Sequence, residues 1–138
     1  MKICIIGGMG DFGLFYAKLF KKRKFDVFIN SRNEIMGEEF CAEKGFTFCK
    51  ENDFKKMDII VFSTPNSITP KLIEDISKKA SKGTLLIDFC SVKSSVVPTL
   101  EKLKGKGFEL ASFHPMHGPR ISIVEIGSFT SCPHPESF

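Results

Sequence analysis

The sequence lacks several features that would assign it to a particular class of protein. It has no tryptophan, and none of its apolar runs approaches the roughly 18 residues that a membrane-spanning helix needs. Its five cysteines are an odd number without C-x-x-C spacing, which argues against a disulfide framework and a zinc site. The first residues also lack the layout of a secretory signal. We therefore expect a cytoplasmic protein with reduced cysteines, no membrane contact and no bound metal.

A strong excess of one charge is absent as well. Twenty Lys and Arg residues stand against 16 Asp and Glu residues, so the formal net charge is +4 at pH 7. The basic residues are spread along the chain, which suits an anionic small molecule but is too diffuse to predict binding to nucleic acid. With 138 residues, 42% of them apolar, the chain is long enough for one domain with a core.

Short apolar runs alternate with stretches of helical periodicity. We expect six strands, at residues 2–6, 25–29, 46–48, 58–62, 84–87 and from 107 onward. We expect the intervening helices at about 12–24, at 35–44, after a cap at Asn66 or Ser67, and with Pro98 in a first turn. Alternation of this kind predicts an α/β fold, a Rossmann-type doubly wound parallel sheet of about six strands with helices on both faces.

The C-terminal residues interrupt this alternation. Residues 121–126 have the pattern of one further strand, whereas 127–138 have no periodicity and are expected to form an irregular tail. We therefore expect a dinucleotide-binding domain over residues 1–120, followed by an extra strand and a tail over 121–138.

A glycine-rich turn follows the first expected strand and opens the first helix: Gly8-Met9-Gly10-Asp11-Phe12-Gly13. In that context G-x-G-x-x-G predicts a dinucleotide site. Gly8 is expected to permit the tight turn, Gly10 to let the backbone approach a pyrophosphate, and Gly13 to let the helix pack on the strand. The unpaired N–H groups of the helix start would bind the phosphates. The alternative is that these glycines serve only a tight turn, and Gly7 has no role that the pattern assigns.

The end of the second expected strand bears on the choice of cofactor. Enzymes that use NAD place an Asp or Glu there, whereas this chain has Asn30-Ser31-Arg32. Ser31 and Arg32 suit a 2′-phosphate, so we favour NADP and keep NAD as the alternative. Thr64-Pro65 follows the fourth strand, where it either covers the nicotinamide ribose or forms only a turn.

Two further segments lie at the same edge of the expected sheet. Residues 88–93 (Asp-Phe-Cys-Ser-Val-Lys) follow the fifth strand, and residues 114–119 (His-Pro-Met-His-Gly-Pro) follow the sixth. They bring the hydroxyl of Ser91, the ammonium of Lys93 and the imidazole of His114 toward the nicotinamide end of a cofactor. A histidine suits proton removal from a carbinol, but spacing alone leaves a structural His114 equally open.

Three segments in this order resemble the prephenate dehydrogenase family: residues 5–10 (Ile-Ile-Gly-Gly-Met-Gly), 87–93 (Ile-Asp-Phe-Cys-Ser-Val-Lys) and 113–119 (Phe-His-Pro-Met-His-Gly-Pro). The resemblance covers residues 1 to about 120. It implies oxidative decarboxylation of prephenate to 4-hydroxyphenylpyruvate with NAD(P), in tyrosine biosynthesis. Some relatives prefer arogenate.

The resemblance also implies roles for individual residues. His114 matches the catalytic histidine, which bonds the ring hydroxyl of the substrate. Ser91 matches the serine that orients both this histidine and the ring hydroxyl. Lys93 and Asp88 are expected to support the loop or the substrate rather than to carry the chemistry. His117 occupies a position that varies in the family, and His134 has no counterpart.

The chain departs from the family after Arg120. Members continue with a helical second domain, which forms the dimer and helps to bind the substrate, and residues 121–138 are too few to supply it. We therefore expect the chain to bind the dinucleotide better than it turns over prephenate, with a homodimer only where such a domain is present. The alternatives are an NADP-binding module without catalysis and a deazaflavin-dependent NADP reductase-like enzyme, which would leave the His114 motif unexplained.

Overall fold

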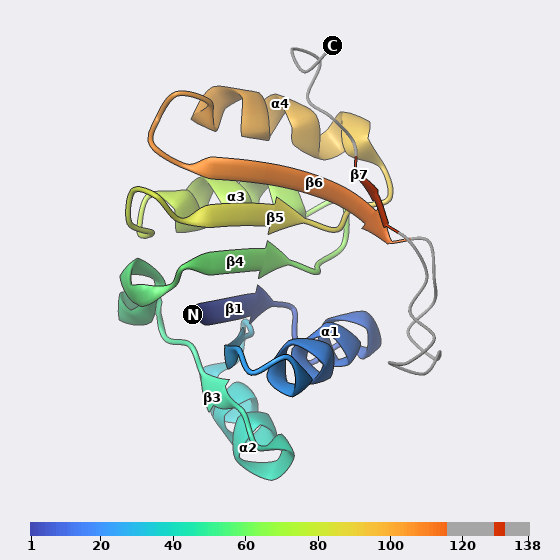
Figure 1. Cartoon of the computed structure of the whole chain (residues 1–138). Coiled ribbons are helices and arrows are strands. Elements are labelled where there is room, and N and C mark those ends of the chain that lie inside the picture. The colour runs from blue at the N-terminus through green and yellow to red at the C-terminus, as the bar shows by residue number, and fades with distance from the viewer. Residues whose placement is uncertain (116–128, 132–138) are drawn as a thin grey trace.

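The computed structural model describes residues 1–115 and 129–131, and the fold is given for these residues (Figure 1). The strands are β1 (Lys2–Ile6), β2 (Asp26–Asn30), β3 (Thr47–Phe48), β4 (Ile59–Phe62), β5 (Leu85–Asp88), β6 (Glu109–Pro115) and β7 (Phe129–Ser131). The helices are α1 (Asp11–Lys22), α2 (Glu34–Lys44), α3 (Thr69–Ser77) and α4 (Lys93–Leu103), with a 3-10 helix, η1, at Glu51–Lys56.

The strands form one sheet in the order β3-β2-β1-β4-β5-β6-β7. The first six strands pair in parallel, and β7 pairs antiparallel with β6. The strand order reverses direction between β1 and β4, so the carboxyl ends of these two strands border the crevice where ligands bind in open α/β sheets. The predicted Rossmann-type, doubly wound fold is confirmed.

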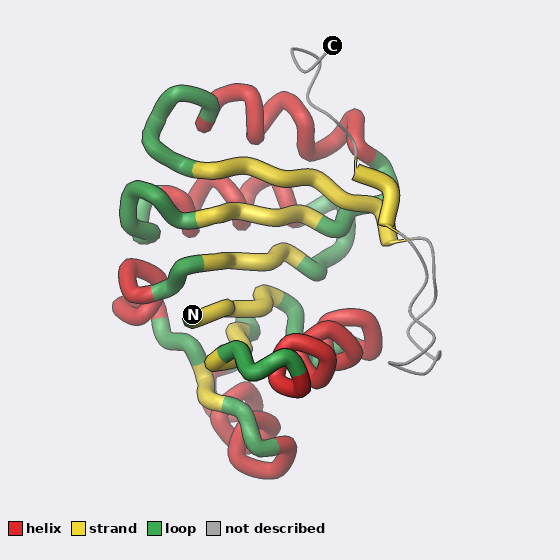
Figure 2. Tube along the Cα trace, viewed as in Figure 1, coloured by secondary structure: helices red, strands yellow, loops and turns green. Residues whose placement is uncertain are grey.

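Helices cover both faces of this sheet (Figure 2), and each face has its own apolar core. Phe15, Tyr16 and Leu19 of α1 pack with Cys41 of α2 on one face. The other core contains apolar residues of α3 and α4, such as Ile73, Ile76, Val96 and Leu100. β1 is therefore buried on both faces, and its residues 3–6 are at most 3% exposed, as expected for a central parallel strand. No helix in residues 1–115 and 129–131 is long and apolar enough to span a bilayer.

The predicted starts of α3 and α4 are wrong. In each case side chains near the edge of the sheet form hydrogen bonds or ion pairs with residues outside the helix. α3 begins at Thr69, with Pro70 in its first turn, rather than at a cap on Asn66 or Ser67. The Thr69 hydroxyl instead donates to the carbonyls of Thr64 and Pro65, and the Asn66 amide bonds Ser91.

α4 begins earlier than the apolar pattern indicated. Lys93 is its first residue, so Pro98 lies inside the helix rather than in the first turn. Pro98 has no N–H to donate to the carbonyl of Ser94, and it is exposed. The ion pair of Lys93 holds the start of α4 against the sheet, which outweighs the preference of proline for a first turn.

The remaining differences concern short elements. η1 lies in a segment, residues 51–56, whose polar composition did not indicate a helix. β7 lies within the stretch expected to be irregular, and its residues 129–131 pair with 113–115 of β6. The strand expected at 121–126 lies outside the described residues.

Candidate functional site

The glycine turn joins β1 to α1, and the residue that makes the tight turn is Gly7 rather than Gly8. Gly7, to which the pattern assigned no role, has φ +83°, a left-handed conformation that side chains rarely adopt. Gly8 has no positive φ; a Cβ there would lie 2.9 Å from the Ile29 side chain. Gly7 therefore supplies the turn, and Gly8 allows the turn to approach β2.

Gly13 and Gly10 differ in how much space a side chain would find at each position. A Cβ on Gly13 would lie 2.3 Å from the carbonyl oxygen of Gly7, so a side chain there would push α1 away from the turn. A Cβ on Gly10 would meet only the Gly7 oxygen, at 3.5 Å, an ordinary contact. Gly13 thus lets α1 pack closely on the turn that follows β1. Among the described residues, no other atom lies within 4 Å of the Gly10 Cβ position, which leaves room for a ligand.

The start of α1 suits an anionic ligand. Gly10 is the N-cap residue and has no side chain to cap the helix. The first N–H groups of a helix have no intrahelical partners, and the helix dipole adds a partial positive charge. Residues 10–13 therefore fit the pyrophosphate of a dinucleotide through backbone atoms alone. Asp11, also predicted to bind the cofactor, is exposed in this first turn.

The end of β2 contains no free carboxylate next to the predicted 2′ site. Asn30 donates to the Cys49 carbonyl at 2.8 Å, and Ser31 donates its hydroxyl proton to the Asn33 carbonyl at 2.9 Å. Arg32 is exposed and has no ion-pair partner in residues 1–115 and 129–131. The nearest acid in the chain, Glu34, pairs with Lys50 at 3.2 Å. Arg32 is therefore the available cation at this end, and Ser31 could donate to a ligand only by giving up its internal hydrogen bond.

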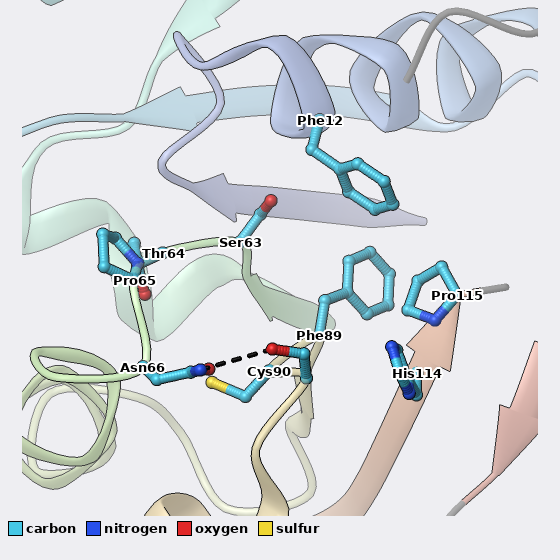
Figure 3. Close-up of a pocket in the computed structure, with 10 residues that line it drawn as sticks. Phe12, Ser63, Thr64, Pro65, Asn66, Phe89, Cys90, His114 and Pro115 are labelled. Carbon is cyan, nitrogen blue, oxygen red and sulfur yellow. Dashed lines mark hydrogen bonds between the residues drawn. The ribbon is translucent and has the colours of Figure 1, made fainter. Parts of the chain in front are cut away.

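A pocket of about 400 Å³ lies at the carboxyl edge of the sheet (Figure 3). It brings together residues from four segments that are far apart in the chain: Phe12 of α1, residues 63–66 after β4, residues 89–91 after β5, and His114 and Pro115 of β6. The predicted residues Phe12, Thr64, Pro65, Ser91 and His114 therefore share one cavity. Ser31 and Arg32 are not among its lining residues; they lie at the end of β2.

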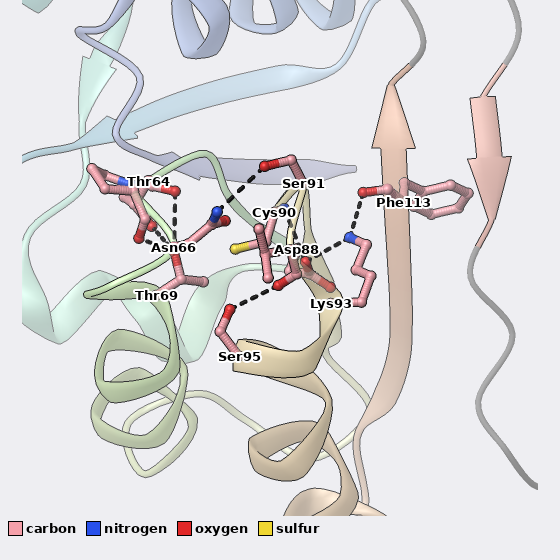
Figure 4. A network of polar contacts seen from close by, with 11 residues as sticks. Thr64, Asn66, Thr69, Asp88, Cys90, Ser91, Lys93, Ser95 and Phe113 are labelled. Atoms are coloured by element: carbon pink, nitrogen blue, oxygen red, sulfur yellow. Dashed lines mark hydrogen bonds and ion pairs between the residues drawn. The ribbon is translucent and has the colours of Figure 1, made fainter.

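The loop from β5 to α4 is anchored by a buried ion pair beneath this pocket. Asp88 is fully buried, and its carboxylate accepts from the Lys93 ammonium at 2.9 Å and from the Cys90 N–H at 3.0 Å. Lys93 also donates to the Phe113 carbonyl at 2.6 Å (Figure 4). Neither Asp88 nor Lys93 lines the pocket. Their contacts tie the Ser91 loop to the residue that precedes His114.

Sequence reasoning did not assign Asn66 to the site. Its side-chain amide donates to Ser91 Oγ at 3.3 Å, and both residues line the pocket. A polar residue directly after Thr64-Pro65, at the same edge of the sheet as Ser91, was the available signal. Ser63, Phe89 and Cys90 were also not predicted to line this cavity.

Cys90 contributes a buried thiol rather than a reactive one. It is 3% exposed, and burial raises the pKa of its thiol, so less of it is thiolate at neutral pH. Cys4, Cys41 and Cys49 are also buried and free. Three predicted or discussed positions, His117, Arg120 and His134, lie outside the described residues.

Comparisons with known proteins agree with the motifs. The family model described as the prephenate dehydrogenase, nucleotide-binding domain, matches residues 16–131. A Methanocaldococcus jannaschii protein named a probable arogenate/prephenate dehydrogenase is 30% identical over 121 residues, which cover 86% of this chain and 27% of that protein. Prephenate dehydrogenase [NADP(+)] of Saccharomyces cerevisiae is 27% identical, with 88% of this chain and 28% of the yeast protein covered. The chain thus spans little more than a quarter of the length of these relatives.

Solved structures show the same fold at low sequence identity. An imine reductase from Myxococcus stipitatus in complex with NADP+ has a TM-score of 0.70 and 19% identity, over 86% of this chain and 42% of that one. A semialdehyde dehydrogenase NAD-binding protein from Cupriavidus necator, in complex with calcium and NAD, has a TM-score of 0.68 and 20% identity, over 88% and 43% of the two chains. Because the family model covers most of the sequence, this chain belongs to the prephenate dehydrogenase nucleotide-binding domain family.

Proposed function

We propose that this chain is the dinucleotide-binding part, over residues 1–120, of an enzyme that oxidises prephenate or arogenate with NADP or NAD. The observation that carries the proposal is the single pocket that joins the start of α1, the Thr64–Pro65 loop, Ser91 and His114. The uncapped helix start and the open space at Gly10 favour a pyrophosphate next to this pocket. The only imidazole that lines the pocket among the described residues is that of His114.

In this proposal the side chains of the pocket transfer a proton, and the cofactor, when bound, accepts a hydride. His114 takes the proton of the ring hydroxyl as the hydride leaves the carbon that carries this hydroxyl. The ring carboxylate departs as carbon dioxide, which makes the ring aromatic, and the proton returns to the oxygen of the phenol product. Ser91 orients the hydroxyl, and Phe12 and Phe89 supply apolar surface to the same pocket.

The proposed preference is for NADP. Arg32 is exposed and free of ion pairs within the described residues, and a guanidinium suits a phosphate. No acidic residue occurs at positions 30–33 to repel a 2′-phosphate. Ser31 has a lesser part in this proposal because its proton is already donated to Asn33.

The experiment that tests the catalytic assignment is turnover of prephenate with NADP+ and with NAD+ by the chain and by its His114→Asn variant. Asparagine keeps a polar side chain but cannot accept the proton as a base. We expect the variant to lose at least about a hundredfold in kcat while NADPH affinity stays within twofold. Undiminished turnover by the variant would refute the role of His114.

A second candidate function is a binding module that holds the dinucleotide without chemistry. The observation that favours it is that the start of α1 can bind phosphate through backbone atoms alone, without the side chains of the pocket. Titration of cofactor fluorescence, followed by a turnover assay on the same sample, separates the two functions. Tight binding with no turnover would favour the module, and turnover would exclude it.

A further inference from the structure

The contact between Asn66 and Ser91 bridges two loops that the proposed reaction needs side by side. Asn66 follows β4, Ser91 follows β5, both line the pocket, and their side chains are in contact (Figure 4). The amide Nδ2 of Asn66 lies 3.3 Å from Ser91 Oγ and donates to it. The chemistry proposed above uses Ser91 but gives Asn66 no part.

The loop that carries Asn66 is held in place by two hydroxyl groups. Thr69 is fully buried, and its hydroxyl donates to the carbonyls of Pro65, at 2.9 Å, and Thr64, at 3.1 Å. Thr69 Oγ1 also lies 2.6 Å from Thr64 Oγ1. A threonine hydroxyl has a single proton, which Thr69 uses on the carbonyls, so Thr64 is the donor in the contact between the two hydroxyls. These bonds fix the turn at residues 64–66 on the start of α3.

The loop that carries Ser91 is fixed from the other side. Lys93 bonds both Asp88 and the Phe113 carbonyl, which anchors residues 88–93 to β6. Asp88 is the register partner of Ser112, two residues before His114. Ser91 and His114 therefore extend from the carboxyl ends of adjacent strands, about 4.8 Å apart in a sheet. The Asn66–Ser91 bond therefore joins two loops that are each anchored by further hydrogen bonds.

The direction of this bond determines what Ser91 can offer to a ligand. A serine hydroxyl has one proton and two lone pairs, and the amide of Asn66 occupies a lone pair. Within residues 1–115 and 129–131 the Ser91 proton has no acceptor, so it is available on the pocket side. We propose that Asn66 is a positioning residue that makes Ser91 a hydrogen-bond donor toward His114 or toward the oxygen of a ligand held between them. This inference rests on the proposed function only for the identity of that ligand.

The first test examines the bond itself, in the 138-residue chain without any ligand. In a nitrogen–proton NMR spectrum, the Ser91→Ala variant should shift a side-chain amide proton of Asn66 upfield and speed its exchange with water. The side-chain amide of Asn52, exposed in η1 and remote from the pocket, is the matched control and should not move. If the Asn66 amide protons do not respond, Asn66 does not donate to Ser91 and the proposal is overturned.

The second test examines the consequence for turnover of prephenate with NADP+. Asn66→Ala should lower kcat about tenfold, within the range of up to about a hundredfold that a misplaced reactive group costs, with KM for NADP+ unchanged within twofold. Asn66→Asp should lower kcat further, because a carboxylate accepts the Ser91 proton and turns it away from the ligand. Asn52→Asp adds the same charge elsewhere and should have no effect.

The third comparison asks whether Asn66 acts through Ser91. In a Ser91→Ala chain, Asn66→Ala should cause less than a further twofold loss of kcat, since the hydroxyl that it positions is gone. Additive losses in the double variant, or an Asn66→Asp chain as active as Asn66→Ala, would overturn the proposal. If the unaltered chain binds NADPH but does not turn over prephenate, the binding module is favoured over the catalytic function, while the amide spectrum still decides the bond.

Discussion

The two loops that frame the candidate site are built in opposite ways. The glycine turn after β1 owes its shape to missing side chains: Gly8 and Gly13 leave space for close backbone approach, and Gly10 has no side chain to cap α1. The loop after β5 owes its shape to side chains that are present, above all the buried pair of Asp88 and Lys93. Adding a side chain is therefore expected to disturb the structure of the cofactor end of the site, whereas removing a side chain is expected to disturb the reaction end.

The largest effect is expected from breaking the ion pair beneath the reaction end. Lys93→Met leaves Asp88 buried without its counter-charge, which should lower the free energy of unfolding by about 3–5 kcal/mol. Urea denaturation measures the change. Lys102→Met, on an exposed position of α4, is the control and should cost less than about 0.5 kcal/mol. Equal stability of the two variants would mean that the pair does not anchor the loop.

Adding one methyl group to the glycine turn should have the next largest effect. Gly13→Ala places a Cβ 2.3 Å from the Gly7 oxygen, so α1 must shift, at a cost of about 1–3 kcal/mol in unfolding free energy. Gly10→Ala is the matched variant, because its Cβ finds only an ordinary 3.5 Å contact. We expect it to cost less than about 1 kcal/mol, the scale of an N-cap change. If the two substitutions cost the same, the close approach of α1 to the turn is not what Gly13 provides.

A smaller effect, on selectivity rather than stability, is expected at the end of β2. Arg32→Ala should weaken NADPH binding about tenfold, or about 1.4 kcal/mol, and leave NADH binding within twofold. Fluorescence titration of both cofactors measures this, with Arg23→Ala at the C-cap of α1 as the control. Equal losses for the two cofactors would show that Arg32 does not contact a 2′-phosphate.

The sequence predicted the fold well because its strongest signals are local. A buried parallel strand such as β1 is apolar on both faces, and the glycine motif directly follows it. It also placed His114, Ser91 and Thr64 at one edge of the sheet, since parallel strands end together. What it missed depends on contacts between distant residues. The bond from Asn66 to Ser91, and the anchoring that starts α4 at Lys93 instead of near Pro98, connect positions that no periodicity relates.

The glycine turn illustrates the same limit on a smaller scale. The motif assigned the tight turn to Gly8, yet Gly7 is the residue with positive φ. Spacing identifies a set of glycines, but the roles within the set depend on which neighbours each glycine faces, here Ile29 for Gly8 and the Gly7 oxygen for Gly13.

The central claim, that backbone groups at the start of α1 bind the diphosphate of a dinucleotide, is tested most directly by titrating NADPH into the chain and its Gly10→Asp variant. Within the described part of the chain, a Cβ on Gly10 meets only the Gly7 oxygen, at 3.5 Å, so the variant should stay folded. We expect its carboxylate to repel the phosphates and weaken binding at least about thirtyfold, or about 2 kcal/mol. Binding of equal strength by the two chains would contradict the account.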